Sequence, residues 1–165
     1  AAITQADPRW ARCDIKSVNL LPNVLARQAA AAAGASEAIL IRAGQAVEGA
    51  ATNLFAVIDG QVRTPSLARN ILAGVTRGLV LECCARLGLS TSETDIAEPV
   101  LHAAEEIWLC SSTKELLAVT RLDGRPVGAG RPGPLWRQVH AAMQAVLHAH
   151  CPGTTAPSLK AAARS

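Results

Sequence analysis

Residues 37–64 read EAILIRAGQAVEGAATNLFAVIDGQVRT, and this stretch decides the fold class. The apolar runs at 37–42 and 53–58 have the length and composition of buried strands. Asp59-Gly60 is a strong hairpin signal, so residues 61–64 are expected to return as the antiparallel partner of 53–58. The stretch therefore predicts a sheet that contains antiparallel pairs.

Helices are expected on both sides of this stretch. Pro22 suits a first helical turn, and the alanine-rich helix that follows should run to Ala33, stop at Gly34 and pack close to the sheet. A second helix should open at Gly74–Arg77, with Thr76 as its N-cap, and end at Gly88. The other expected elements are an extended segment at 8–17, a strand at 89–94, a short helix at 99–104, a strand at 106–111, a second hairpin from 116–122 and 125–127, and a helix at 135–148. Two hairpins among alternating helices and strands predict an α/β fold with a mixed sheet flanked by helices.

Composition narrows the function classes. The chain has 165 residues, of which 50% are hydrophobic and 18% charged, so we expect about one globular domain. The net charge is only +3, the arginines are scattered and aromatics make up 2%, which argues against nucleic-acid binding. Every apolar run is shorter than the roughly 18 residues of a membrane span, and no signal peptide is expected. The chain lacks a starting Met, so we expect a processed or truncated piece.

The cysteines and histidines predict no metal site. The chain has five cysteines and no C-x-x-C pair, which indicates reduced thiols in a cytoplasmic protein rather than zinc ligands or a disulfide framework. His148 and His150 are interpreted as exposed histidines at a helix end. From Cys151 onward the composition predicts a frayed, disordered tail, 151–165.

Four segments carry the candidate chemistry. Taken singly, each has an ordinary structural explanation, such as a surface lysine, a turn glutamate, a capping threonine or a polar loop. The segments are RWARCDIKSVNLL at 9–21, VEGAATNLF at 47–55, ILAGVTR at 71–77 and SSTKE at 111–115. Together and in this order they resemble the class IV (fold type IV) aminotransferases, which use pyridoxal 5'-phosphate. The resemblance covers about residues 7–146 and is strongest to the D-amino-acid (D-alanine) branch of that family.

The resemblance implies a role for two ionisable residues. Lys16 would hold the cofactor as a Schiff base and, once released, move a proton as the catalytic residue. Burial and the charges of Arg9 and Arg12 are expected to favour its neutral amine. If residues 15–17 form a strand, Lys16 points away from both neighbours. Glu48 would keep the pyridine nitrogen protonated.

The remaining implied contacts concern the phosphate and the ring. A helix N-terminus binds phosphate through its free N–H groups. The implied cofactor-binding residues are Val75 and Thr76 at that helix start, Ser111, Ser112 as the second phosphate contact, and Leu72 against the ring. Thr113 would lie near the substrate carboxylate. Ala50 and Ala51 stand where the family often has serines, so any contact from those hydroxyls is lost.

The resemblance implies that residues 1–150 are the large C-terminal, pseudo-barrel domain, since the family's smaller N-terminal domain has no counterpart here. The implied reaction transfers an amino group between an amino acid, D-alanine or another D-amino acid, and a 2-oxo acid in a homodimer. Without the other domain the chain is expected to bind cofactor weakly and transaminate poorly. A branched-chain aminotransferase, a 4-amino-4-deoxychorismate lyase and a non-catalytic fragment stay open as alternatives.

Overall fold

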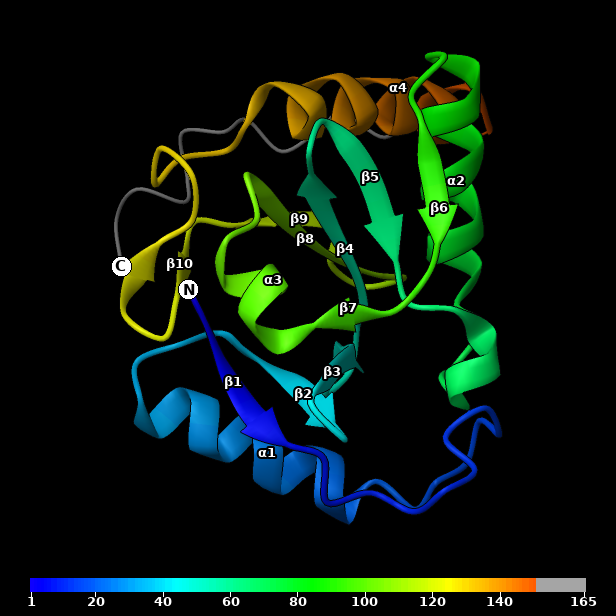
Figure 1. Cartoon of the computed structure of the whole chain (residues 1–165). Helices are drawn as coiled ribbons and strands as arrows, with labels where there is room; N and C mark the ends of the chain where they lie inside the picture. Colours follow the sequence, from blue (N-terminus) through cyan, green and yellow to red (C-terminus); the bar gives the residue numbers. More distant parts are fainter. Residues whose placement is uncertain (151–165) are drawn as a thin grey trace.

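The computed structural model describes residues 1–150, which form two mixed sheets with helices around them (Figure 1). The six-stranded sheet has the order β11-β10-β1-β2-β3-β7 and the five-stranded sheet the order β6-β5-β4-β8-β9. The first sheet contains β1 (Ala2–Ala6), β2 (Glu37–Arg42), β3 (Gln45–Gly49), β7 (Ile96–Ala97), β10 (Arg121–Leu122) and β11 (Arg125–Pro126). The second contains β4 (Asn53–Ile58), β5 (Gln61–Thr64), β6 (Thr91–Glu93), β8 (Glu106–Ser111) and β9 (Glu115–Val119).

The helices cover opposite ends of the molecule. They are α1 (Leu21–Ala32), α2 (Val75–Arg86), α3 (Glu98–His102) and α4 (Pro134–His150), and a 3-10 turn spans Leu67–Arg69. In Figure 1, α1 lies below β1 and β2, whereas α2 and α4 lie together beside the second sheet. The α/β prediction with a mixed sheet is confirmed, and both sheets mix parallel and antiparallel pairs.

Residues 54–58 of β4 are all apolar because both faces of the strand are buried. Leu54 and Ala56 pack in the core cluster that also includes Ile39 of the first sheet. Phe55 points to the other side, into the cluster formed with α2 and α4, where it lies opposite Trp108 of β8. Alternating residues of one strand therefore join the two halves of the core.

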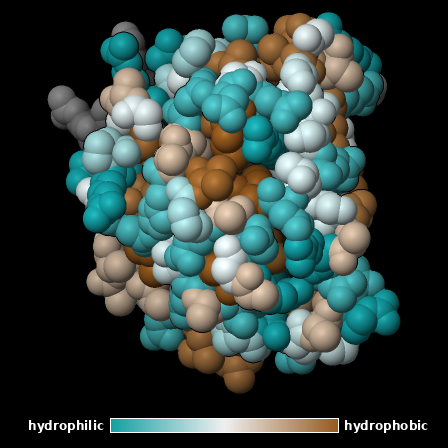
Figure 2. All heavy atoms as spheres, in the orientation of Figure 1, coloured by the Kyte–Doolittle hydropathy of each residue, from teal (hydrophilic) through white to brown (hydrophobic). Residues whose placement is uncertain are grey.

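The alanines of α1 allow close packing on the first sheet, as predicted. Ala26 and Ala30, four residues apart, are fully buried against Leu40 and Val47. The opposite side of α1 leaves apolar side chains exposed, and Figure 2 shows apolar atoms at the lower edge of the molecule, where α1 lies. These exposed residues are Leu21, Val24 and Leu25.

The strands at 37–42, 53–58, 61–64 and 106–111 are confirmed to the residue. The prediction for 8–17 was wrong in one respect, because no strand forms there and residues 15–17 belong to a loop. The backbone N–H of Ile15 donates to the carbonyl of Arg12 at 3.1 Å, and the side chains of Arg12 and Asp14 pair across the same turn. This local turn competes with extended structure.

Two further predictions were wrong in detail. Gly74, not Thr76, is the N-cap of α2, and Val75 is its first helical residue. The second hairpin contains only β10 and β11, because residues 115–119 pair with β8 in the other sheet. The chain crosses from the second sheet to the first at Thr120. The short hairpin of β10 and β11 then turns at Asp123-Gly124, where both residues have positive φ.

No helix among residues 1–150 is long and apolar enough to cross a membrane. His148 is exposed, while the side chain of His150 and the predicted tail lie outside the described residues. In the described part of the chain, no group of three or more His, Cys, Asp or Glu side chains could hold a metal ion.

Candidate active site

A cavity of about 810 Å³ lies where the four candidate segments meet. Its walls come from the loop before α1, the end of β3, the start of α2 and the turn after β8. All the residues singled out from the sequence line it: Lys16, Glu48, Leu72, Val75, Thr76, Ser111, Ser112 and Thr113. The tertiary structure thus brings together positions that are up to 97 residues apart in the chain (16 to 113).

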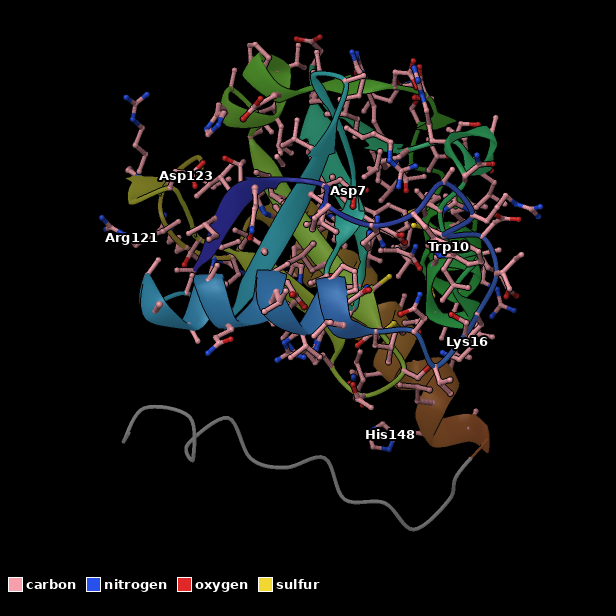
Figure 3. The ribbon with its side chains drawn as sticks, turned by 90° about the horizontal axis from the view of Figure 1, so that it is seen from below. Asp7, Trp10, Lys16, Arg121, Asp123 and His148 are labelled. Carbon is pink, nitrogen blue, oxygen red and sulfur yellow. The ribbon has the colours of Figure 1, made fainter. Side chains whose placement is uncertain are left out.

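Lys16 lies on the loop of residues 7–20, which connects β1 to α1. Figure 3 shows Asp7 near the centre of the view and Lys16 farther along the same loop, toward the edge. Lys16 is exposed and makes no hydrogen bond or ion pair with the other described residues. We expected this amine to be buried, and that prediction was wrong for residues 1–150, where Lys16 is exposed. The neighbouring cations are paired with carboxylates instead, Arg9 with Asp7 and Glu48, and Arg12 with Asp14.

Glu48 presents a buried carboxylate at the cavity wall, 4% exposed at the end of β3. Its Oε1 accepts from Arg9 Nη1 at 2.6 Å. Its Oε2 accepts from the Leu72 backbone N–H at 3.3 Å and from Asn53 Nδ2 at 3.4 Å. Burial raises the pKa of the Glu48 carboxyl above its usual value, although the charge and hydrogen bond of Arg9 act in the opposite direction.

Arg9 is itself held in place by a second carboxylate. The Asp7 side chain is fully buried, and it accepts from Arg9 Nε at 2.9 Å and from Arg42 Nη2 at 2.6 Å. Burial acts to raise the pKa of Asp7, but the hydrogen bonds and charge of Arg9, together with Arg42, hold it below its usual value. The chain of charges Arg42–Asp7–Arg9–Glu48 therefore connects β2, the 7–20 loop and β3.

The start of α2 offers an anion site to the cavity. Gly74 supplies no side-chain cap, and the first turn contains no acidic residue. The free N–H groups of the first helical turn and the partial positive charge there are therefore available to a phosphate. Val75 is 86% exposed and Thr76 follows it, both at the cavity wall.

Gly74 has no Cβ for a packing reason. A Cβ built there would lie 2.1 Å from Oδ1 of Asn53. The Nδ2 of the same Asn53 donates to the Leu72 carbonyl at 2.8 Å and to Glu48. Asn53, the first residue of β4, thus holds the segment just before α2 in place through its bond to Leu72.

The turn between β8 and β9 carries Ser111, Ser112 and Thr113. The Ser111 hydroxyl accepts from the Lys114 backbone N–H at 3.2 Å and lies 3.4 Å from the Thr113 hydroxyl. Ser111 therefore shapes the turn on which Ser112 and Thr113 reach the cavity wall.

Sequence reasoning assigned no role to Asp7 or Asn53, and it gave Arg9 a different one. The sequence did mark two of these residues as candidates. Asn53 is the last residue of the E-G-x-x-x-N pattern, and Arg9 is the first residue of the first candidate segment. Cys110 also lines the cavity, but burial raises its pKa to about 12, so its thiol stays protonated near neutral pH. The described cysteines Cys13, Cys83, Cys84 and Cys110 are all free and buried.

Comparison with known proteins identifies the family. Residues 2–122 match the family described as amino-transferase class IV. The chain belongs to this family. It is 43% identical over 144 residues to a D-alanine aminotransferase of Bacillus licheniformis, which covers 87% of this chain and 51% of the relative. It is 36% identical over 148 residues to a D-alanine aminotransferase of Staphylococcus aureus, which covers 90% of this chain and 52% of the relative.

Solved structures agree with this class IV fold. A branched-chain amino acid aminotransferase from Thermobaculum terrenum, in its PLP form, superposes with a TM-score of 0.85 at 26% identity over 90% of this chain and 50% of that one. A fold IV transaminase from Curtobacterium pusillum gives 0.78 at 29% identity, covering 87% and 52% of the two chains. The chain spans about half the length of the relatives it matches.

Proposed function

We propose that the protein containing this chain is a pyridoxal-phosphate-dependent aminotransferase that moves an amino group between a D-amino acid, D-alanine foremost, and a 2-oxo acid. The observation that carries the proposal is that Lys16, the buried Glu48 carboxylate and the uncapped start of α2 share one cavity. The 43% identity to a D-alanine aminotransferase supports the substrate class.

The cavity fits the cofactor by the chemistry of its donors and acceptors. The Lys16 amine, which has no partner in the described part of the chain, would complement the aldehyde of the cofactor. The buried Glu48 carboxylate would complement a protonated ring nitrogen, and the helix start without acidic residues would complement a phosphate. When bound, the cofactor supplies a carbonyl that takes up the amino group and a ring that withdraws electrons from the substrate carbon. Leu72 offers an apolar side chain for the ring face.

Lys16 acts as the covalent anchor and then as the proton carrier. Its amine is free of ion pairs in residues 1–150, so no salt bridge must break before it reacts. With the cofactor bound, this amine would take a proton from the substrate α-carbon and deliver it to C4′ of the cofactor, the carbon on the other side of the shared nitrogen. Its place on a loop rather than a strand gives the amine reach into the cavity.

Glu48 keeps the ring nitrogen protonated. Burial disfavours the charged carboxylate, and Arg9 at 2.6 Å offsets part of that cost. The Leu72 N–H and Asn53 restrain the other oxygen, so the carboxylate has a fixed orientation. Glu48 thus offers a directed carboxylate whose own side chain is buried.

In this proposal the phosphate would be held by Val75 and Thr76 at the start of α2 and by Ser112, which follows Ser111 at the cavity wall. Thr113 would contact the substrate carboxylate. The phosphate carries nearly two negative charges, and the N–H groups at the start of α2 meet it without a competing side-chain cap. Anchoring at the phosphate leaves the ring and Lys16 to do the chemistry.

The domain organisation is part of the proposal. Residues 1–150 would be the C-terminal, cofactor-binding domain, with a further domain and a second copy of the protein covering the open side of the cavity. Exposed apolar side chains around the cavity support such a cover: Trp10, Ile15, Leu20, Val24 and Val75 are all at least 45% exposed. The cytoplasmic location and the homodimer stay predictions.

A branched-chain aminotransferase is the second candidate, favoured by the superposition with the Thermobaculum terrenum enzyme. The test uses the full-length protein with pyridoxal phosphate and an acceptor 2-oxo acid. We expect a visible absorption band from covalently bound cofactor and turnover of D-alanine at least about 100-fold faster than that of L-leucine, because a stereospecific pocket discriminates on this scale.

Faster turnover of L-leucine would support the second candidate instead. Conversion of 4-amino-4-deoxychorismate would indicate a lyase. A folded protein that gives no absorption band with the cofactor would be a non-catalytic scaffold, and the proposal would be wrong.

A further inference from the structure

A second, smaller cavity of about 110 Å³ lies behind the wall of the large one. Thr52 lines both cavities, so its side chain forms part of the partition between them. On the far side of this partition lie Glu37 from the start of β2 and Lys114 from the turn between β8 and β9. Neither residue lines the large cavity.

Glu37 is a buried charge with one close cation. The residue is 1% exposed, and its Oε1 accepts from the backbone N–H of Ala38 at 3.2 Å. Its Oε2 has no hydrogen-bond partner among residues 1–150, and Lys114 Nζ lies 3.6 Å from that oxygen. A buried carboxylate without a nearby cation is strongly unfavourable, so the charge of Lys114 offsets the cost of burying the Glu37 carboxylate.

Gly49, the last residue of β3, lies close to both Glu37 and Thr52. A Cβ built on Gly49 would lie 2.0 Å from the Thr52 hydroxyl and 3.3 Å from Cγ of Glu37. The absence of a side chain at Gly49 therefore lets Thr52 and Glu37 approach each other behind Glu48. The Thr52 hydroxyl is buried and has no hydrogen-bond partner in residues 1–150, so nothing but packing restrains it.

We propose that Glu37 and Lys114 are a pair of positioning residues that holds the β8–β9 turn against the loop after β3 and thereby sets where Ser112 and Thr113 stand at the cavity. The inference rests on the proposed function, because it concerns the phosphate and substrate contacts of that same site. Lys114 directly follows Thr113, so a displacement of Lys114 is passed to Thr113 through one peptide bond.

The two members of the pair differ in what their loss leaves behind. The Lys114 side chain is 25% exposed and can turn to solvent when Glu37 is neutralised. Glu37 cannot, since its side chain is 1% exposed. Removing the lysine therefore strands a buried carboxylate, whereas removing the carboxylate does not strand the lysine. Lys114→Met should consequently disturb the site more than Glu37→Gln.

The experiment uses the full-length protein, with and without pyridoxal phosphate. The variants are Lys114→Met, the conservative Lys114→Arg, Glu37→Gln, and Arg86→Met as the control. Arg86 belongs to an exposed ion pair with Glu82 on α2, so its substitution removes a cation of similar size far from the turn. Hydrogen exchange of the apoprotein is measured for peptides covering 49–55, 77–87 and 110–117, and KM and kcat are measured for the loaded enzyme.

We expect Lys114→Met to speed exchange in 49–55 and 110–117 and to leave 77–87 unchanged. We expect it to raise KM for the amino acid about tenfold, with kcat changed less than about threefold, because a misplaced binding group weakens substrate capture first. Glu37→Gln should show the same effects at smaller size. Lys114→Arg should restore KM to within about twofold of the parent, as should Arg86→Met.

Unchanged exchange in 110–117, or faster exchange in all three peptides, would overturn the inference, because the second result indicates a general loss of stability. An unaltered KM in Lys114→Met would overturn it as well. These outcomes are distinct from failure of the proposed function, in which the parent protein itself shows no transamination. The exchange measurement on the apoprotein tests the pair even then.

Discussion

Arg9 donates to Glu48 across 2.6 Å, although 39 residues separate them in the chain. Through this contact the loop that carries Lys16 is fastened to the strand that carries the candidate ring-nitrogen carboxylate. Since Arg9 is also held by Asp7, one buried network joins the loop that carries Lys16 to the strand that carries Glu48.

Lys16→Ala should abolish covalent attachment of the cofactor. Borohydride reduction of the full-length protein with pyridoxal phosphate, followed by peptide mass spectrometry, should place the modification on Lys16 of the parent and nowhere in the variant. Lys160→Ala, a change outside the described residues, serves as the control and should keep the modification. Retention of the label in Lys16→Ala would move the site to another lysine.

Glu48→Gln should reduce kcat on the order of 10²-fold, because a neutral amide no longer holds the charge of the ring nitrogen. Cofactor affinity should fall less, since the phosphate contacts at the start of α2 are untouched. Arg9 keeps its bonds to Asp7, so the protein should stay folded. Steady-state kinetics and cofactor titration check this, with the exposed Glu82→Gln as the control; full activity in Glu48→Gln would refute the assignment.

Asp7→Asn should lower the free energy of unfolding by about 3–5 kcal/mol, because it leaves two arginines without their shared buried carboxylate. Urea unfolding of the full-length protein measures this. Asp14→Asn is the matched control, since its ion pair with Arg12 is largely exposed; it should cost no more than about 1 kcal/mol. Equal effects of the two substitutions would contradict a special role for Asp7.

The same carboxylate predicts a pH dependence of stability. The pKa of Asp7 is held below the ordinary value of 3.8, so its contribution is present above that pH and is lost as the pH falls through the lowered pKa. Glu48 has the opposite effect on stability, because its pKa is raised in the folded protein. Its contribution to the free energy of unfolding is present at low pH and is lost as the pH rises through the raised pKa. Unfolding midpoints measured below pH 4 should fall less steeply in Asp7→Asn than in the parent.

Gly74→Ala should weaken cofactor binding, because the new Cβ would lie 2.1 Å from Oδ1 of Asn53 and push that side chain from Leu72 and Glu48. Gly78→Ala, one turn farther along α2, is the matched control. A Cβ at Gly78 meets nothing within 4 Å, so this change should stabilise the helix by roughly 0.5–1 kcal/mol and leave cofactor affinity intact. Fluorescence titration of the apoprotein with pyridoxal phosphate distinguishes the two variants.

The sequence predicted well those strands whose signal is local, that is, carried by residues adjacent in the chain. β4 and β8 are continuous apolar runs, and the Asp59-Gly60 turn fixes the register of β5 beside β4. The sequence missed β1 and β3 because their mixed composition has no clear period, and their strand structure depends on pairing with β2 on either side.

The candidate site divides in a similar way. The residue types and their order were sufficient to select Lys16, Glu48 and the start of α2. The partners of Glu48 were not predictable, since Arg9 lies in a loop whose path depends on contacts with Asp7 and Arg42. The exposure of Lys16 likewise depends on what packs over the loop.

The sequence by itself determined the two hairpin turns, the apolar strands, the alanine face of α1 and the family to which the four segments belong. These depend on side-chain chemistry and short-range backbone preference, which are written into neighbouring residues. Only the tertiary structure decided that residues 115–119 pair in one sheet while 121–126 cross to the other, and that Glu37 lies buried beside Lys114. Such pairings depend on the burial and charge compensation of residues far apart in the chain, and no local pattern records which distant partner a side chain will meet.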